Sequence, residues 1–515
     1  MDTKALRQKI LDLAIRGKLV PQDPNDEPAS VLLERIRQQK QQMVKDGKLK
    51  PKDIKNDSVI FVGEDNLHYE KFADGSVKCI EDEVPFGLPD GWAWVRLGNL
   101  SAAIQYGLSN SAEPQGTHRL LRITDIQDGK VDWNAVPFTT VNDPEAYLLK
   151  TGDIVFARTG ATVGKSFLIT ETPYPSVYAS YLIRIRLLGS LSPEYIYQFF
   201  DSACYWSQIT DKSVGVGQPN CNGTSLKELF IPLPPISEQL RIVPTAQALL
   251  AYVAKIDAEK KSLLSIIMAT KSKILDLAIR GQLIPQDPND EPASVLLERI
   301  CAEKEELIKQ GKIKRDKKES VIFRGEDNSY YEKVGDKVEN ISDEIPFELP
   351  DGWFFVRLKE LWELISGRDL SPSEYNADGV GIPYITGASN FVDGKVELAR
   401  WTTSPQVITE AGDLLLTCKG TIGGMAFNDF GNAHIARQIM AIRNTFALNS
   451  EYLALCMRFY INAIKDAAKG LIPGISREDI LNLILPVPSP NYQAKIVERV
   501  AEVTNILSAI EKSLS

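Results

Sequence analysis

The chain has 515 residues, of which 43% are hydrophobic and 25% charged, and its formal net charge is −9 at pH 7. This length exceeds what one hydrophobic core organises, so we expect two globular domains and a connecting framework. The six cysteines form no CxxC pair or His/Cys cluster, which argues against a disulfide scaffold and against a metal site. The N-terminus is charged and no apolar run could cross a bilayer, so we expect a soluble, cytoplasmic protein without a membrane partner.

The first part of the chain is repeated in its second half. Residues 9–36, KILDLAIRGKLVPQDPNDEPASVLLERI, return at 273–300 with 26 of 28 positions identical. SVIFVGEDN at 58–66 then returns as SVIFRGEDN, and LPDGW occurs twice, whereas the interiors that follow match only loosely. Two long copies predict a pseudo-twofold molecule, because a solenoid shows many short repeats.

In each copy a Pro/Asp-rich turn leads to an amphipathic helix, a Lys-rich stretch (45–55 and 309–318) and a short hairpin. The lysines either contact DNA phosphates or form a solvated helix end, and the sequence leaves both readings open.

The segment 86–236 is predicted to be a mixed α/β domain. It contains strand-like runs at 92–97, 154–157 and 181–188, a helical pattern from Ser192, and a Pro-rich closing strand, IPLPP. GATVGKS, which follows the strand IVFA, resembles a P-loop but is one residue short between its glycines, so a strand-to-strand loop is favoured. The chain has no GxGxxG, GxSxG or HExxH motif, and His68, His118 and His434 have no spaced partners, so no catalytic or metal-binding residues are predicted.

A long helix is predicted after this domain, from about Pro244 to a stop at Gly281, roughly 55 Å in length. Its apolar residues follow a 4-3 heptad spacing, and the C-terminus repeats this seam. The helix seam comprises Leu249, Val253, Ile256, Leu263, Ile267, Ile274 and Leu277, and then Ile496, Val500, Val503, Leu507 and Ile510.

The repeat offsets indicate that the two chain ends together rebuild the central helix, because Leu6, Ile10 and Leu13 continue the C-terminal seam. We therefore expect the termini to meet and the split helix to pack antiparallel on the intact one. The alternative is that both seams are core-facing helices of separate domains.

The expected fold class is α/β, in the sense of mixed α+β: two domains joined by a pair of long antiparallel coiled-coil helices in a circular pseudo-twofold repeat. The predicted segments are the split framework helix with its extension at 1–85, the first domain at 86–236, the central helix with its extension at 237–346, the second domain at 347–490, and the C-terminal half of the split helix at 491–515.

An ordered set of motifs occurs twice and resembles the specificity subunits of type I restriction-modification enzymes. The set is LPDGWAWVRLGNL and LPDGWFFVRLKEL, then GDIVFARTGATVGK and GDLLLTCKGTIGG, then PLPPISEQLRIV with a long helix and KILDLAIRG. No single motif is specific, but the ordered set, repeated along nearly the whole chain, is.

The resemblance implies a non-catalytic subunit that directs a complex in phage defence. Each target-recognition domain would read half of a bipartite double-stranded DNA site, and the helices would set the spacer and dock two methyltransferase subunits. Restriction/translocase subunits would join them, and S-adenosylmethionine, ATP and Mg would be bound by the partners, with no cofactor in this chain.

The first domain carries 11 Lys/Arg against 13 Asp/Glu and the second 12 against 16, so we expect weak DNA binding by the chain alone. Base contacts are expected from polar and cationic residues of the Gly-rich loops. The DNA-binding candidates are Arg122, Arg158, Thr159, Lys165, Gln218 and Asn220 in the first domain, and Arg368, Thr386, Lys419, Thr421 and Arg437 in the second.

Three alternatives remain open. One is a specificity subunit of a related phage-defence or combined nuclease-methyltransferase system, and another is a scaffold that binds only proteins. The third is a nucleotide-hydrolysing enzyme that uses the glycine loop.

Overall fold

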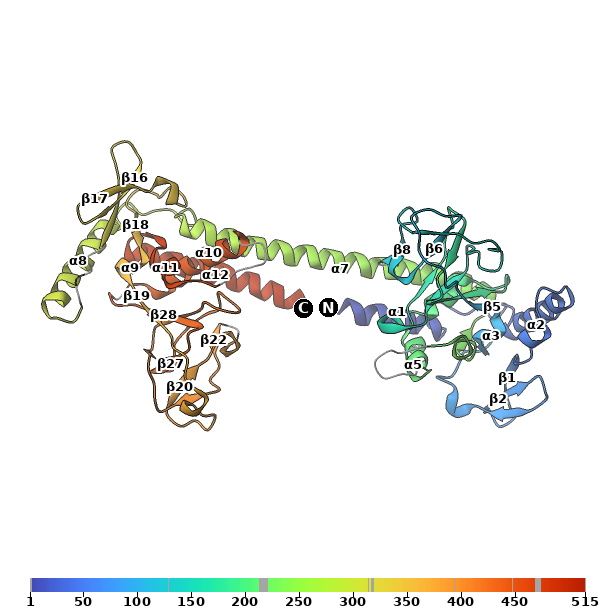
Figure 1. Ribbon diagram of the computed structural model, residues 1–515. Coiled ribbons are helices and arrows are strands. Elements are labelled where there is room, and N and C mark those ends of the chain that lie inside the picture. The colour runs from blue at the N-terminus through green and yellow to red at the C-terminus, as the bar shows by residue number, and fades with distance from the viewer. Residues whose placement is uncertain are drawn as a thin grey trace. The chain divides into compact units, whose positions relative to one another are not determined.

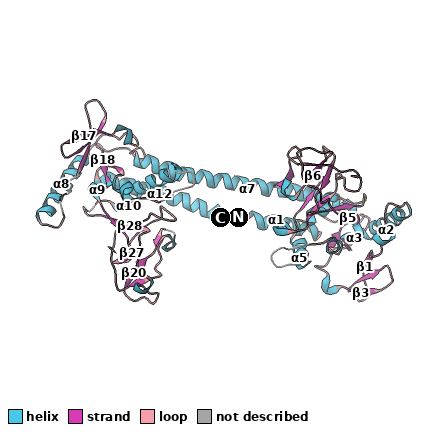
Figure 2. Ribbon diagram, viewed as in Figure 1, coloured by secondary structure: helices cyan, strands magenta, loops and turns pink. Residues whose placement is uncertain are grey.

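The computed structural model describes residues 2–127, 129–212, 221–313, 315, 319–392, 394–446, 448–467 and 474–514 (Figure 1). Contacts divide the chain into two compact units, Met1–Lys261 and Ser262–Ser515. Both units combine helices with short strands (Figure 2), which confirms the mixed α/β class. None of the helices in these described ranges has the length and apolarity that a membrane crossing requires.

The first unit begins with two helices and a small sheet, continues into the recognition domain and ends in the first part of α7. Its helices are α1 (Thr3–Ile15), α2 (Ala29–Lys45), α3 (Leu97–Leu100), α4 (Pro193–Phe199), α5 (Ala203–Lys212), α6 (Gly223–Lys227) and α7 (Ile236–Ile279), which continues into the second unit. Its strands are β1 (Ser58–Val62), β2 (His68–Phe72), β3 (Val77–Cys79), β4 (Ala93–Arg96), β5 (Ser101–Tyr106), β6 (His118–Leu121), β7 (Ile126–Gln127), β8 (Lys130–Val131), β9 (Phe138–Thr139), β10 (Ile154–Ala157), β11 (Ser166–Leu168), β12 (Ser176–Tyr178), β13 (Leu182–Leu187) and β14 (Phe230–Leu233).

The second unit repeats this order. Its further helices are α8 (Ala293–Lys309), α9 (Leu358–Leu361), α10 (Ser450–Ala467), α11 (Arg477–Leu481) and α12 (Pro490–Leu514). Its strands are β15 (Ser320–Arg324), β16 (Tyr330–Val334), β17 (Lys337–Asn340), β18 (Phe354–Arg357), β19 (Glu363–Ser366), β20 (Ile382–Ile385), β21 (Phe391–Val392), β22 (Lys395–Val396), β23 (Trp401–Thr402), β24 (Ile408–Thr409), β25 (Leu414–Thr417), β26 (Met425–Phe427), β27 (Ala433–Ile435), β28 (Ile439–Arg443) and β29 (Ile484–Val487).

Corresponding sheets recur in the two units. The extension sheets have the orders β1-β2-β3 and β15-β16-β17, so the predicted hairpins are confirmed and each gains a third strand. The central sheet of each recognition domain is antiparallel, with the order β11-β10-β13-β5 in the first unit and β19-β28-β25-β26 in the second. A smaller mixed sheet accompanies each, β12-β6-β9 and β23-β20-β27-β24. The closing strands β14 and β29 pair with β4 and β18.

The central sheet is buried on both faces, because strand residues alternate between two cores. In the first unit Ile154 and Phe156 belong to the core shared with the helices, whereas Val155 and Ala157 belong to the core that includes Leu121 and Tyr178 of the smaller sheet. In the second unit Leu414 and Leu416 belong to the core shared with the helices, whereas Leu415 belongs to the core between the two sheets. Continuous apolar runs such as IVFA and LLLT are therefore explained by burial on both sides.

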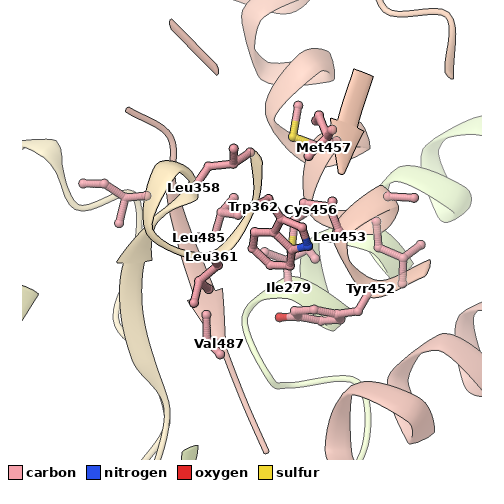
Figure 3. Packing of buried hydrophobic residues seen from close by; sticks show 14 of the residues in the cluster. Ile279, Leu358, Leu361, Trp362, Tyr452, Leu453, Cys456, Met457, Leu485 and Val487 are labelled. Carbon is pink, nitrogen blue, oxygen red and sulfur yellow. The ribbon is translucent and has the colours of Figure 1, made fainter. Parts of the chain in front are cut away.

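The helical core of the second unit gathers residues from distant parts of the sequence. Figure 3 shows Trp362 among Leu361 of α9, Leu453 and Cys456 of α10, and Ile279 of α7, all of them buried. The framework helix therefore shares one core with the recognition domain, which fixes the base of that domain to the helix.

In each unit the first and the last helix run antiparallel. In the first unit, Thr3 of α1 donates to Asp257 of α7 (3.0 Å), and Ile10 clusters with Ala246 and Val253. In the second, Lys271 of α7 pairs with Glu511 of α12 (2.6 Å), whereas Tyr492, at the start of α12, donates to the carbonyl of Ile284.

The seam is confirmed at some positions and differs from the expectation at others. Val253, Ile267 and Ile274 are buried, as are Ile496 and Val500, and Val503 and Leu507 pack against the same core. Leu249 (37%), Leu263 (38%) and Ile510 (40%) are exposed, and Ile256 and Leu277 are half-buried. Asp257, Lys271 and Glu511 are half-buried and form polar pairs between the helices, since Asp257 accepts from Thr3 and Lys271 pairs with Glu511. An apolar pattern could not reveal these pairs.

The start of the long helix was predicted wrongly. Helix α7 begins at Ile236, and Pro244 lies inside it. Gln239 and Ile242 are fully buried, and this burial stabilises the turns before the proline despite the missing N–H.

The predicted end is confirmed. Gly281 has a φ of +67°, and the N–H of Gln282 donates to the carbonyl of Leu277 (2.8 Å), as in a Schellman stop.

Candidate nucleic-acid interface

The central sheet of the first unit brings four residues at or next to strand ends together at one end of the sheet. Strands β5, β13, β10 and β11 are antiparallel neighbours, so the ends of β5 and β10 lie beside the starts of β13 and β11. Tyr106 ends β5, Arg158 follows β10, Tyr181 precedes β13 and Lys165 precedes β11. We call this end of the central sheet, where Tyr106, Arg158, Lys165 and Tyr181 lie, the sheet end of the unit.

Arg158 is held at the sheet end of the first unit by several contacts. Its guanidinium carbon lies 4.9 Å from the ring centroid of Tyr106, a cation–π geometry, and its amide N–H donates to the carbonyl of Tyr181 (3.1 Å). The hydroxyl of Tyr106 accepts from the amide N–H of Gly223 (2.9 Å), which fixes the ring. The arginine head is therefore oriented by an aromatic platform.

Thr159 and Lys165 lie in the loop between β10 and β11. Thr159 is half-buried and Lys165 is exposed. Because β10 and β11 form an antiparallel hairpin, the glycine segment is a strand-to-strand loop, as predicted. A P-loop leads into a helix, and this loop does not.

Arg122 lies at the same sheet end, at the end of a strand of the smaller sheet. Strand β6 runs parallel to β12, with Leu121 opposite Tyr178, so Arg122 and Ala179 leave the sheet side by side. The guanidinium pairs with Asp125 (2.7 Å), and this hydrogen bond raises the pKa of Arg122. Its charge is thus already partly compensated. Gln218 and Asn220 lie outside the described residues.

The sheet end of the second unit gathers the five candidates of that domain. Arg368 follows β19, Lys419 and Thr421 lie between β25 and β26, and Arg437 precedes β28. Thr386 follows β20, which runs parallel to β27, so Thr386 lies beside the residues that follow β27. Arg368, Lys419, Thr421 and Arg437 are exposed, and Thr386 is half-buried.

Three of these candidates have side-chain partners within the unit, and the first is Arg368, whose Nη1 donates to Gln406 Oε1 (3.5 Å). The Arg437 Nε lies 2.6 Å from Oδ2 of Asp369, and Thr386 Oγ1 donates to Asn390 Oδ1 (3.0 Å). Cys418, next to Lys419, is buried, and burial raises the pKa of its thiol, so it is a packing residue.

His434 has a structural role that its isolation in the sequence did not reveal. It is fully buried, and its Nε2 lies 2.9 Å from the carbonyl oxygen of Arg368. It therefore fixes the backbone that carries Arg368. Within the described ranges, no group of three His, Cys, Asp or Glu side chains could hold a metal ion.

Sequence reasoning missed Tyr106, Tyr181 and Gln438 at the two sheet ends. Tyr106 is 40% exposed and Tyr181 64%, and Gln438 is also exposed. Tyr181 begins the predicted strand 181–188 and Gln438 directly precedes the predicted strand IMAIR, so their positions were an available signal, whereas no strand was predicted before Tyr106.

Comparison with known proteins identifies a family. The model of the type I restriction modification DNA specificity domain matches residues 89–266 and 350–515. The EcoEI type I restriction enzyme specificity subunit of Escherichia coli is 27% identical, with 99% of this chain and 90% of the relative covered. The EcoAI specificity subunit, also of Escherichia coli, is 26% identical, with 97% and 88% covered.

A solved structure supports the fold. A chain from work on assembly and conformational transition of the type I R-M system is similar with a TM-score of 0.53 at 21% identity, covering 84% of this chain and 94% of that one. Two copies of the domain account for more than half of the sequence. The chain therefore belongs to the type I restriction modification DNA specificity family.

Proposed function

We propose that this chain gives a type I restriction-modification complex its DNA sequence specificity, with each sheet end reading one half of a bipartite site. The observation that carries the proposal is the repeated backbone with unlike side chains. The hairpin after Asp153 and the hairpin after Asp413 have the same strand pairing, yet one presents Arg158 and Lys165 and the other Lys419 and Thr421.

Local charge supports this role despite the acidic chain. Lys165 at the first sheet end, and Arg368 and Lys419 at the second, are exposed cations, whereas Arg122 and Arg437 are paired with aspartates. So few cations without an acidic partner at the described parts of the two sheet ends give weak phosphate binding, because affinity for the DNA backbone grows with the number of neutralised phosphates. Partner subunits then supply most of the backbone contacts, and this chain supplies base contacts.

Two like positions on the framework helices support docking of two methyltransferase subunits. Tyr252 on α7 is 67% exposed, and Ile506 on α12, 254 positions later in the repeat, is 55% exposed. Large apolar side chains in such equivalent places suit two copies of one partner. Restriction/translocase subunits join the complex, the chain itself is not catalytic, and S-adenosylmethionine, ATP and Mg are bound by the partners.

The test is the methylation pattern that the complex leaves. The chain is co-expressed with its methyltransferase partner in a host free of DNA methylation, and modified adenines are mapped by single-molecule sequencing. We expect a bipartite motif with a fixed gap. A continuous palindrome would contradict the two-reader arrangement, and methylation in the absence of this chain would contradict its specificity role.

A further inference from the structure

The two sheet ends hold one backbone position in the same way. In the first unit the N–H of Arg158 donates to the carbonyl of Tyr181 (3.1 Å), and in the second the N–H of Cys418 donates to the carbonyl of Gln438 (2.8 Å). The strand registers agree, since Leu182 lies opposite Ala157 and Ile439 opposite Thr417. Tyr181 and Gln438 therefore occupy equivalent positions.

Both equivalent side chains project away from the cores. The next residues, Leu182 and Ile439, are fully buried in the core between the two sheets of their units. Because strand side chains alternate, the preceding residue points elsewhere. Tyr181 is accordingly 64% exposed, and Gln438 is exposed as well.

The amide of Gln438 is free to bind a ligand. Among the residues that the structure describes, its side chain has no hydrogen-bond partner. A Cβ built on Gly387 would stand 2.6 Å from Gln438 Oε1, so this glycine leaves the space through which the side chain extends. The exposed Arg437 is its neighbour in sequence, and Thr386 is the neighbour of Gly387.

We propose that this position reads bases and that Gln438 recognises an adenine of the second half-site. A glutamine amide can donate to adenine N7 and accept from the adenine N6 amino group at once, which is the usual bidentate contact to this base in the major groove. A neutral amide releases no counterion from a phosphate, whereas its paired donor and acceptor match the adenine edge, and this match is the reason for assigning it to a base. The inference rests on the proposed function.

The first domain reads differently at the same position. Tyr181 offers a ring and one hydroxyl group, and its neighbour Arg158 offers a guanidinium that suits guanine O6 and N7. At the position of Arg158 the second domain has the buried Cys418. One backbone site thus presents an Arg–Tyr pair in one unit and a lone glutamine in the other.

The experiment compares the methylation motifs of variants in the full complex, expressed in the methylation-free host. Gln438→Ala is expected to make one base pair of one half-site degenerate, with discrimination there reduced roughly 5- to 150-fold, and to leave the other half-site unchanged. Gln438→Glu is expected to shift preference at that base pair toward cytosine, whose N4 amino group donates to a carboxylate. Gln39→Ala is the control, because Gln39 is an exposed glutamine on α2, outside the two Lys-rich stretches.

Each outcome has a defined meaning. An unchanged motif in both Gln438 variants overturns the inference. If both variants keep the melting temperature of the wild type but lose methylation at every site, the inference is also overturned, because a base-reading residue affects one base pair. Failure of the wild-type chain to direct any sequence-specific methylation would instead overturn the proposed function.

Discussion

Arg186 and Asp153 form a two-point ion pair at the start of β10, the strand that leads to Arg158, with Nε 2.7 Å from Oδ1 and Nη2 2.6 Å from Oδ2. Arg443 and Asp413 repeat the pair in the second unit, at 3.1 Å and 2.9 Å. Both aspartates are buried and directly precede the first residue of the strand that carries the loop. The pair therefore fixes the strand from which unlike side chains project.

Replacing Arg186 by Met should destabilise the first unit by about 3 kcal/mol, because Asp153 would stay buried without its cation. Urea unfolding of the purified chain measures this loss. The double variant with Asp153→Asn is expected to recover part of it, since the uncompensated charge is removed. A single variant as stable as the wild type would show that the pair does not anchor the strand.

Replacing Arg158 by Ala should relax recognition at one base pair of the first half-site. The guanidinium is oriented over Tyr106, and its loss would remove the proposed bidentate contact to guanine, which is worth about 1–3 kcal/mol. Methylation mapping is the measurement, and the second half-site should not change. Arg35→Ala is the control, because Arg35 is exposed on α2 and pairs with Glu27. A wild-type motif would remove Arg158 from the reading residues.

Replacing Tyr252 or Ile506 by Asp should each remove one methyltransferase subunit from the complex. A charge in the centre of an apolar contact is costly, and the two side chains occupy equivalent positions of the repeat. Native mass spectrometry of the assembled complex counts the subunits. Glu259→Ala, on an exposed part of α7, is the control. Full assembly with both variants would place the docking surface elsewhere.

Replacing Gly281 by Ala should destabilise the second unit more than replacing Gly311 by Ala. Both glycines have a similar φ, +67° and +69°, so both variants incur about 1–2 kcal/mol for a left-handed alanine. A Cβ at Gly281 would also stand 2.7 Å from Pro350, whereas at Gly311 nothing lies within 4 Å. Equal unfolding midpoints would mean that Pro350 moves without cost.

Replacing Glu332 by Gln should reduce the acid sensitivity of the second unit. The hydrogen bond from Arg357 lowers the pKa of Glu332 from its ordinary value of 4.5. A lowered pKa contributes stability above the unfolded value, and this contribution is lost as pH falls through the folded value. The variant should therefore be less stable than the wild type at pH 7, and the difference should shrink as the pH falls below 4.5 and through the lowered pKa of Glu332. Calorimetry across this range is the measurement, and Glu339→Gln, exposed on β17, should behave as the wild type at every pH.

Much of the local structure could be predicted from the sequence. The runs IVFA, LLLT and IMAIR are strands with nearly the expected bounds, and Gly281 ends the long helix as expected. These elements depend on local rules, because apolar runs between turn residues favour strands and a left-handed turn favours glycine. The near-identical repeat likewise established that the chain contains one framework twice.

Tertiary structure decided which side chains face inward and which gather at the sheet ends. Leu249, a predicted seam residue, is exposed. Asp257 faces α1 because its carboxylate accepts a hydrogen bond from Thr3, and apolar periodicity cannot predict such a polar contact. Ile236 begins α7 because buried residues hold the turns ahead of Pro244. Tyr181 and Gln438 became candidates only through strand pairing with residues far away in sequence. Such non-local contacts cost chain entropy that burial offsets, so they follow from the whole packed unit and not from any single segment.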